Sequence, residues 1–315
     1  MEIVHRSVLQ EEIFKYLKPL RHNALMIDAT IGEGGHSELF LQRIPDIRIV
    51  GVDADPEIIE IAKERLKEFN ARIQFFNIWF NTFFKEYPLG EERPDIILFD
   101  LGISTYHFEK SKRGFSFQKD EALDMRLDSS LEISAADVIN QYPEKEIADI
   151  FYEYGEEVFS KKIAHAVCRA RKQKRIDTSK ELGEIIRRAV PPDKRHRRSH
   201  PATRCFQALR IVVNGELARL DAVLGSALKV LKVGGRMGVV SFHSLEDRIT
   251  KTFFKEKNMS CTCPPEWPMC KCGGKQIVEL ITKRAVKPGK EEIIKNPSSR
   301  SARFRIIEKI AEEEL

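Results

Sequence analysis

The chain has 315 residues, of which 42% are hydrophobic, and 53 Lys or Arg stand against 48 Asp or Glu. This composition is typical of a soluble globular protein, and the length suits one large domain with an insertion or two domains. No apolar run approaches about 18 residues, which excludes a transmembrane helix. The charged start lacks the apolar segment of a signal peptide, so we expect a cytoplasmic protein that does not contact a membrane.

The net charge of +5 is unevenly distributed along the chain. Residues 161–210 hold sixteen Lys or Arg and four Asp or Glu, a local charge of +12, so the remaining residues sum to −7. A basic segment in an otherwise acidic chain indicates a polyanionic partner that binds at one place, with a solvated helical surface as the alternative. We favour a nucleic acid, because arginines and histidines are interleaved around a proline in this segment.

The first hundred residues predict alternating helices and strands. After a helix at 8–20, strands are expected at 23–30, 47–55, 71–80 and 93–104, with helices at 37–44 and 56–69. This alternation predicts a parallel sheet that is covered by helices on both faces.

The alternation then stops and later resumes. Residues 105–204 are helical and polar in pattern, without a convincing strand. A single long helix is expected at 206–231, then strands at 236–244, 276–286 and 302–310. We therefore predict an α/β core from residues 1–104 and 205–315, interrupted by an inserted helical and basic domain at 105–204.

The stretch "DATIGEGGHSEL" at 28–39 follows the first strand and predicts a cofactor loop. Glycines between a strand and a helix let backbone N–H groups approach a cofactor closely. Gly32 and Gly34 fit the G-x-G-x-x-G dinucleotide fingerprint, but Ser37 replaces its third glycine. Asp53, at the end of the second strand, can accept both ribose hydroxyls of a nicotinamide cofactor or of S-adenosylmethionine.

The fourth strand ends in Asp100, in the stretch "DIILFDLGIST". A carboxylate here would face the reactive end of a cofactor across the crevice at the strand ends. Methyltransferases that act on amino groups need such an acceptor, whereas nicotinamide enzymes do not usually need one. The alternative is that Asp100 caps a helix. We therefore predict Asp100 to be catalytic.

At this point the sequence resembles the bacterial small-subunit (16S) rRNA cytosine-N4-methyltransferase family over essentially its whole length. The resemblance rests on a series of motifs in a fixed order. They are "GEGGHS" at 32–37, "DLGIST" at 100–105, "RGFSF" at 113–117, "LDMR" at 123–126, "YGEE" at 154–157, "HPATRCFQALRI" at 200–211, "SFHSLEDR" at 241–248 and "NPSSRSARFR" at 296–305.

The resemblance implies a class I methyltransferase fold and an enzyme that uses S-adenosylmethionine. It implies methylation of the exocyclic 4-amino group of a cytidine in the decoding centre of 16S rRNA. His107 stands where the family has a glutamine, and Trp79 is the alternative to Phe80 beside the adenine. By this resemblance the cofactor contacts are Gly34, Gly35, His36, Asp53, Phe80, Asp100 and His107.

The implied reaction is an in-line displacement on a weakly nucleophilic amine. Alignment can supply effective molarities of about 10⁵–10⁸ M, whereas a general base adds about 10²–10⁴-fold, so Asp100 need not be a strong base. Methylation at carbon 5 of cytosine needs a cysteine nucleophile, and no cysteine lies near "DLGIST".

RNA contacts are expected mainly in the insertion, because the target base must leave its stack and the phosphates must be neutralised. Phe115 and Phe117 would stack on bases, unless both belong to a core. The stretches 169–175 and 193–204 would hold the RNA. His243 is a substrate-pocket and catalytic candidate from the other side of the crevice. The predicted RNA contacts are Arg113, Phe115, Phe117, Arg197, Arg198, His200 and Arg204.

Four cysteines form the pattern "CTCPPEWPMCKC", which is compatible with a structural zinc site. They are Cys261, Cys263, Cys270 and Cys272. The partner is expected to be small-subunit rRNA within the small ribosomal subunit, and a homo-oligomer stays open. The alternatives are a nicotinamide-dependent oxidoreductase and a non-catalytic rRNA-binding assembly factor with a relic cofactor pocket.

Overall fold

The computed structural model describes residues 7–195, 200–260 and 274–313. The chain divides into two compact units. The first unit combines residues 1–102 with 217–315, and the second unit consists of residues 103–216. Across the described residues, none of the helices combines the length and the apolar character that a membrane span requires.

The first unit is built on a seven-stranded sheet with the order β3-β2-β1-β4-β5-β7-β6. Strands β1 to β5 are parallel, while β7 is antiparallel to both of its neighbours. The strands are β1 (Leu25–Asp28), β2 (Arg48–Asp53), β3 (Ile73–Asn77), β4 (Ile96–Asp100), β5 (Arg236–Ser241), β6 (Val278–Leu280) and β7 (Arg303–Lys309). Asp28, Asp53 and Asp100 each end a parallel strand, so all three lie along the same edge of the sheet.

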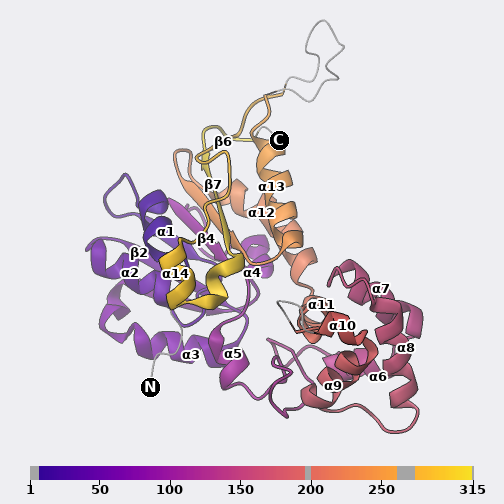
Figure 1. The fold of residues 1–315 in the computed structure, drawn as a ribbon. Coiled ribbons are helices and arrows are strands. Elements are labelled where there is room, and N and C mark those ends of the chain that lie inside the picture. The colour runs from indigo at the N-terminus through magenta and orange to yellow at the C-terminus, as the bar shows by residue number, and fades with distance from the viewer. Residues whose placement is uncertain (1–6, 196–199, 261–273, 314–315) are drawn as a thin grey trace, which may run out of the picture. The chain divides into compact units, whose positions relative to one another are not determined.

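Helices cover both faces of this sheet, as side chains alternate between two cores. Ile27 and Phe99 face the core under α4, α12 and α13, whereas Met26 and Leu98 face the core under α1, α2 and α3. Figure 1 labels these helices around the strands. They are α1 (Gln10–Leu17), α2 (Gly35–Arg43), α3 (Pro56–Arg65), α4 (Phe80–Glu86), α12 (Glu216–Val230) and α13 (Ser244–Lys257).

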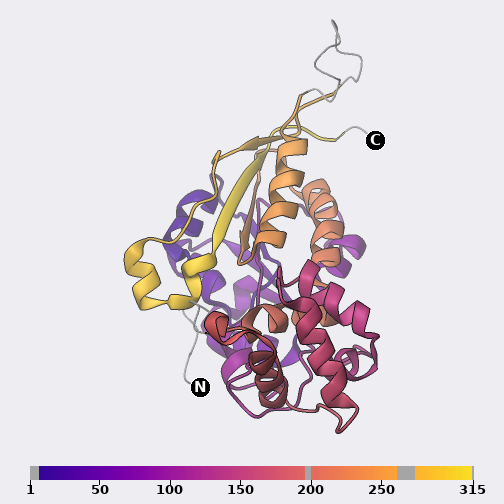
Figure 2. The same ribbon diagram turned by 45° about the vertical axis from the view of Figure 1, so that its right-hand side comes forward.

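Short elements complete the first unit. Figure 2 shows the long strand β7 in yellow beside α13 in orange, and α13 packs against both β5 and β7. The short elements are η1 (Lys67–Arg72), α14 (Lys290–Lys295) and η2 (Pro297–Ser301). The sheet confirms the parallel α/β architecture that the sequence predicted.

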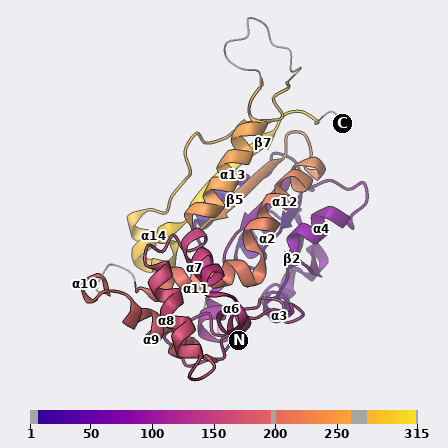
Figure 3. The same cartoon turned by 90° about the vertical axis from the view of Figure 1, so that its right-hand side faces the viewer.

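The second unit is helical and has its own core, in which Phe151, Ile163 and Leu209 are fully buried. Helix α8 packs against both α7 and α9, as Figure 3 shows. The helices are α5 (Thr105–Glu109), α6 (Ala135–Gln141), α7 (Glu144–Glu153), α8 (Ser160–Arg171), α9 (Ser179–Ala189), α10 (Pro192–Arg195) and α11 (Ala202–Asn214).

The prediction of one long helix at 206–231 is wrong. Helix α11 ends at Asn214 and α12 begins at Glu216, with Gly215 between them at φ 61°. Glycine adopts this left-handed conformation at little steric cost, and it commonly ends helices. The second unit consequently extends to residue 216, beyond the boundary predicted at 204, because α11 packs in its core.

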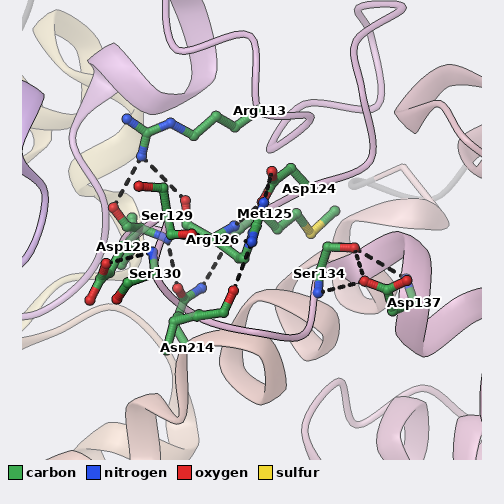
Figure 4. A network of polar contacts seen from close by, with 12 residues as sticks. Arg113, Asp124, Met125, Arg126, Asp128, Ser129, Ser130, Ser134, Asp137 and Asn214 are labelled. Carbon is green, nitrogen blue, oxygen red and sulfur yellow. Dashed lines mark hydrogen bonds and ion pairs between the residues drawn. The ribbon is translucent and has the colours of Figure 1, made fainter.

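A polar network orders the loop between α5 and α6 (Figure 4). Met125 has φ 60°, and its carbonyl accepts a hydrogen bond from Nδ2 of the buried Asn214 at 2.8 Å. The same amide accepts from the N–H of Leu127 at 2.8 Å, while Arg126 pairs with Asp124 at 2.7 Å. The motif "LDMR" therefore fixes a strained turn inside the second unit.

Candidate functional site

The glycine loop between β1 and α2 depends on two left-handed residues and one close approach. Gly32 and Gly34 have φ 53° and 82°, which side chains other than glycine rarely adopt. A Cβ on Gly35 would lie 2.0 Å from Oγ of Ser7. The backbone geometry thus favours glycine at all three positions, and together these glycines let the chain turn sharply into the first turn of α2.

Asp53 at the end of β2 is oriented by backbone donors. Its Oδ2 accepts a hydrogen bond from the N–H of Gly32 at 3.0 Å, and its Oδ1 accepts one from the N–H of Asp55 at 3.0 Å. The carboxylate therefore ties the glycine loop to the neighbouring strand. A carboxylate has acceptor positions for about four hydrogen bonds, so this one can also receive hydroxyl donors.

Three titratable side chains gather where β1 and β4 end. Nε2 of His36, in the first turn of α2, lies 3.3 Å from Oδ2 of Asp100, and their side chains are 5% and 16% exposed. Oγ of Ser37 donates a hydrogen bond to Oδ2 of Asp28 at 2.7 Å. This bond holds the first turn of α2 against β1 and thereby places His36 beside Asp100.

This cluster is rich in buried polar atoms without hydrogen-bond partners. Within the described part of the chain, eight such side-chain atoms occur, and four of them belong to this cluster. They are Oδ1 of Asp28, Nδ1 and Nε2 of His36, and Oδ1 of Asp100. Buried polar groups nearly always have partners, so this concentration indicates a site shaped for a polar ligand.

Burial also changes the acidity of the cluster. Desolvation raises the pKa of Asp28 to about 6, although the charge of His36 and the hydrogen bond from Ser37 both lower it. The nearby carboxylate of Asp100 adds to the increase. Perturbed groups of this kind are commoner at functional sites than elsewhere.

The aromatic candidates near β3 differ in their surroundings. The ring of Phe80 packs edge-on against Phe99 with 5.8 Å between centroids. The guanidinium of Arg219 lies 3.9 Å from the ring centroid of Trp79 and donates to Oδ1 of Asn81 at 3.1 Å. Both rings are half-buried, so both stay candidates for stacking against a cofactor base.

His243 follows β5 and is the N-terminal cap of α13. Its Nδ1 accepts a hydrogen bond from the N–H of Glu246 at 3.4 Å, and Nε2 lies 3.0 Å from Oε1 of Glu246. Oε2 of Glu246 in turn accepts from the N–H of His243 and of Phe242. This reciprocal capping gives His243 a structural role, whatever it does in addition.

His107 belongs to the second unit, unlike the other predicted cofactor residues. It is 4% exposed and its ring packs edge-on against Phe115 at 5.3 Å. Phe115 is also 4% exposed and belongs to the core of this unit. The ring of Phe115 is therefore buried among apolar side chains, which favours the alternative that it belongs to a core, and its stacking on a base stays a prediction.

The guanidinium of Arg113 binds backbone carbonyls of its own unit. Its Nη1 donates to the carbonyls of Arg126 and Leu127 at 3.2 and 3.1 Å. The adjacent Gly114 has φ 71°, and a Cβ there would lie 2.2 Å from the carbonyl oxygen of Ala122. The "RGFSF" motif thus builds the loop of the second unit, and the predicted RNA contact by Arg113 would require this guanidinium to rearrange.

Phe117, His200 and Arg204 lie closer to the surface. The rings of Phe117 and His200 stack with 4.4 Å between centroids, and burial and the charge of Arg187 lower the pKa of His200. Nη1 of Arg204 donates to the carbonyl of Glu156 at 2.8 Å from an exposed position.

Some predicted residues lie outside the described part of the chain. These are Arg197, Arg198, Cys261, Cys263, Cys270 and Cys272. Their predicted roles in RNA binding and in a zinc site stay predictions.

Two residues of the site were given no role by the sequence. Asp28 lies inside the glycine-loop motif. Its position as an acidic residue at the end of a buried strand was the signal that could have indicated a role in the site. Oγ1 of Thr30 accepts a hydrogen bond from the N–H of Asp100 at 2.7 Å, and it ties the ends of β1 and β4 together. Only the pairing of those strands reveals this bond.

Comparison with known proteins yields matches along the whole chain. A profile of the MraW methylase family matches residues 2–310. A protein named ribosomal RNA small subunit methyltransferase H from Treponema denticola is 53% identical over 98% of each chain. One of the same name from Carboxydothermus hydrogenoformans is 45% identical over 99% of each chain. A solved rRNA methylase from Streptococcus thermophilus covers 98% of this chain and 100% of its own, at 8% identity and a TM-score of 0.42.

The family profile and the two named relatives confirm the resemblance that the motifs indicated. The seven-stranded sheet and the helical second unit agree with the methyltransferase fold that the resemblance implied. The family profile also favours S-adenosylmethionine-dependent methyl transfer over nicotinamide-dependent oxidation, because the matching family is one of methylases.

Proposed function

Because the chain belongs to the MraW methylase family, we propose that it methylates the exocyclic 4-amino group of a cytidine in the decoding centre of 16S rRNA, with S-adenosylmethionine as methyl donor. The similar proteins carry the name ribosomal RNA small subunit methyltransferase, which supports this substrate. The observation that carries the proposal is the approach of His36 to Asp100 at the sheet edge beside the glycine loop.

The described residues have the hydrogen-bonding groups and charges that S-adenosylmethionine would need. The left-handed Gly32 and Gly34 would let the loop turn closely around it, and Asp53 would accept the ribose hydroxyls. S-adenosylmethionine carries an ammonium and a sulfonium, and the oxygens of Asp28 and Asp100 that lack partners suit a cationic ligand. Phe80 would lie beside the adenine, and the cofactor contact of His107 stays a prediction.

The chemistry requires alignment more than strong basicity. When bound, the cofactor supplies the methyl group and leaves as a neutral sulfide. The amine of cytosine loses a proton as its nitrogen forms the new bond to carbon, and Asp100 would accept that proton. Nε2 of His36, which lies 3.3 Å from Oδ2 of Asp100, would then take up this proton and return Asp100 to its carboxylate form. His243, which caps α13 at the end of β5, is a further candidate for holding the substrate base.

The RNA would be held by the second unit. Among the predicted contacts, Phe117, His200 and Arg204 stand near the surface, and Arg113 would have to leave its carbonyl partners. We do not include Phe115, because its ring is buried. The proposed substrate is the rRNA within the small ribosomal subunit, which would place the enzyme in the cytoplasm.

The proposal can be tested in a bacterium that lacks its own version of this enzyme. The wild-type chain or the Asp100→Asn variant is supplied, and 16S rRNA fragments are analysed by mass spectrometry. We expect the 4-amino methyl group on a decoding-centre cytidine with the wild-type chain and its loss with Asp100→Asn. A methyl group at another nucleotide would overturn the substrate assignment. Absence of the methyl group even with the wild-type chain, together with normal subunit assembly with both chains, would favour the assembly-factor alternative.

A further inference from the structure

Helix α8 of the second unit presents a surface that consists entirely of basic side chains. From Ser160 to its C-terminal cap Lys172, every residue classed as exposed is Lys, Arg or His. They are Lys161, Lys162, His165, Arg169 and Lys172. We call these five residues the α8 basic face. At 100° per residue they fall within one sector of about 100°.

The opposite side of α8 packs in the core of the second unit. Ile163, Ala164 and Val167 are fully buried, and Cys168 is 6% exposed. The apolar side of this helix is therefore already covered within its own unit. What α8 offers to a partner is positive charge alone.

The four Lys and Arg charges on this face are not neutralised by ion pairs among the described residues. Within the described residues, no carboxylate lies within ion-pair distance of Lys161, Lys162, Arg169 or Lys172. Other cations of this basic segment are engaged. Arg171 donates to the carbonyl of Ile139, and Arg175 pairs with Asp177 at 2.8 Å. The availability of charge thus distinguishes the α8 basic face from the rest of the stretch 169–175.

We propose that the α8 basic face binds the phosphate backbone of the RNA substrate, with Lys161, Lys162, Arg169 and Lys172 as the phosphate contacts. This inference rests on the proposed function and names the surface that holds its substrate. The face runs about 16 Å along the helix from residue 161 to 172, at about 1.5 Å per residue. An extended strand can follow such a row of cations.

The neighbouring helix favours a narrow partner over a flat anionic surface. The exposed charged residues of helix α7 are four acids and one lysine, namely Glu144, Glu146, Asp149, Glu153 and Lys145. Nδ1 of His165 lies 3.2 Å from Oε1 of Glu144, so the acidic surface of α7 adjoins the α8 basic face. A membrane of anionic lipid would meet both helices and be repelled by α7. A single RNA strand can follow α8 alone, and the acidic residues would confine it there.

The test compares two full-length variants that lose equal charge. The first carries Lys161→Gln, Lys162→Gln, Arg169→Gln and Lys172→Gln. The control carries Lys63→Gln, Lys67→Gln, Lys251→Gln and Lys255→Gln, all on exposed positions of the first unit. Binding to 16S rRNA is measured over a series of salt concentrations, and far-UV circular dichroism with thermal unfolding reports that each variant is folded.

We expect the slope of log K against log salt to become shallower by about 0.7 for each phosphate that is no longer neutralised, up to about 2.8 in the first variant. Methyl transfer to small subunits should show a raised KM with little change in kcat. The control should keep the wild-type slope. Equal slopes in all three proteins, or equal changes in both variants, would overturn the inference.

Two further measurements separate the possible failures. Binding of the wild-type chain to vesicles of phosphatidylserine, abolished in the first variant while RNA binding is kept, would overturn the inference in favour of a membrane. Absence of methyl transfer by the wild-type chain would refute the proposed function, whereas the salt dependence of RNA binding would still decide the role of the α8 basic face.

Discussion

Nε2 of His36 lies 3.3 Å from Oδ2 of Asp100, although the two residues come from the first turn of α2 and from the end of β4. Asp28 supports this pair from β1, because it accepts a hydrogen bond from Ser37, the residue after His36. The polar centre of the site is therefore assembled by the fold itself, on strands that pair side by side.

Asp100→Asn should remove the proton acceptor and leave the fold intact. We expect kcat for methyl transfer to fall about 10²–10⁴-fold, which is the usual contribution of a general base. Binding of S-adenosylhomocysteine should change much less, since the glycine loop and Asp53 are untouched. Asp46→Asn, at a carboxylate that bonds the exposed His22, is the matched control. An Asp100→Asn variant with wild-type kcat would contradict the assigned role.

Asp28→Asn should remove a loss of stability that the wild-type protein undergoes as the pH rises. The folded-state pKa of Asp28 is raised to about 6 from 3.8, so the unfolded state ionises first as the pH rises. Stability is therefore lost between about pH 4 and pH 6, by up to about 3 kcal/mol at 1.36 kcal/mol per pKa unit.

Urea unfolding of both proteins at pH 4, 5 and 8 measures this effect. The Asp28→Asn variant should match the wild type near pH 4 and exceed it in stability above pH 6. A stability difference that did not depend on pH would mean that the pKa of Asp28 is the same in the folded and unfolded states, which would contradict the raised pKa.

Gly35→Ala should disturb the start of α2 through Ser7. The added Cβ would lie 2.0 Å from Oγ and 3.3 Å from Cβ of the buried Ser7, so this serine must change its rotamer and the backbone must shift slightly. We expect a loss of about 1–3 kcal/mol in the free energy of unfolding, and weaker cofactor binding. The double variant Ser7→Gly with Gly35→Ala should recover most of both. Failure of the double variant to recover would place the clash elsewhere.

His243 offers a test that separates capping from catalysis. Asparagine is a good N-cap, whereas alanine is not, and losing the cap costs about 1 kcal/mol. If His243 acts only through α13, His243→Asn should keep both stability and methyl transfer, while His243→Ala should lose stability. A stable His243→Asn variant with strongly reduced kcat would instead assign the imidazole to the reaction. Thermal unfolding and steady-state kinetics together distinguish these cases.

The sequence predicted which residues end the strands, but it did not predict the distances between side chains that lie on different elements. Asp53 and Asp100 could be placed because each ends an apolar run, which parallel-sheet proteins use for binding. The distance between His36 and Asp100 could not be predicted, since it depends on β4 pairing with β1 across nearly seventy residues of chain. The break at Gly215 had a local signal, because glycine after a periodic run commonly ends a helix.

Burial in the second unit was the hardest property to predict. Phe115 and Phe117 alternate in one short loop, yet only Phe115 enters the core, because helices distant in sequence enclose it. Arg113 carries a charge that suggests phosphate, but its guanidinium satisfies carbonyls of a strained turn. The composition predicted RNA binding by this unit, whereas the basic residues that are exposed for the proposed binding emerge only from the packing of α8.

The most direct test of this account is methyl transfer from labelled S-adenosylmethionine to purified small ribosomal subunits that lack the modification, followed by mapping of the labelled nucleotide. The account predicts label on the 4-amino group of one decoding-centre cytidine with the wild-type chain, and its near absence with Asp100→Asn. Label on another atom or nucleotide, or undiminished transfer by Asp100→Asn, would contradict it.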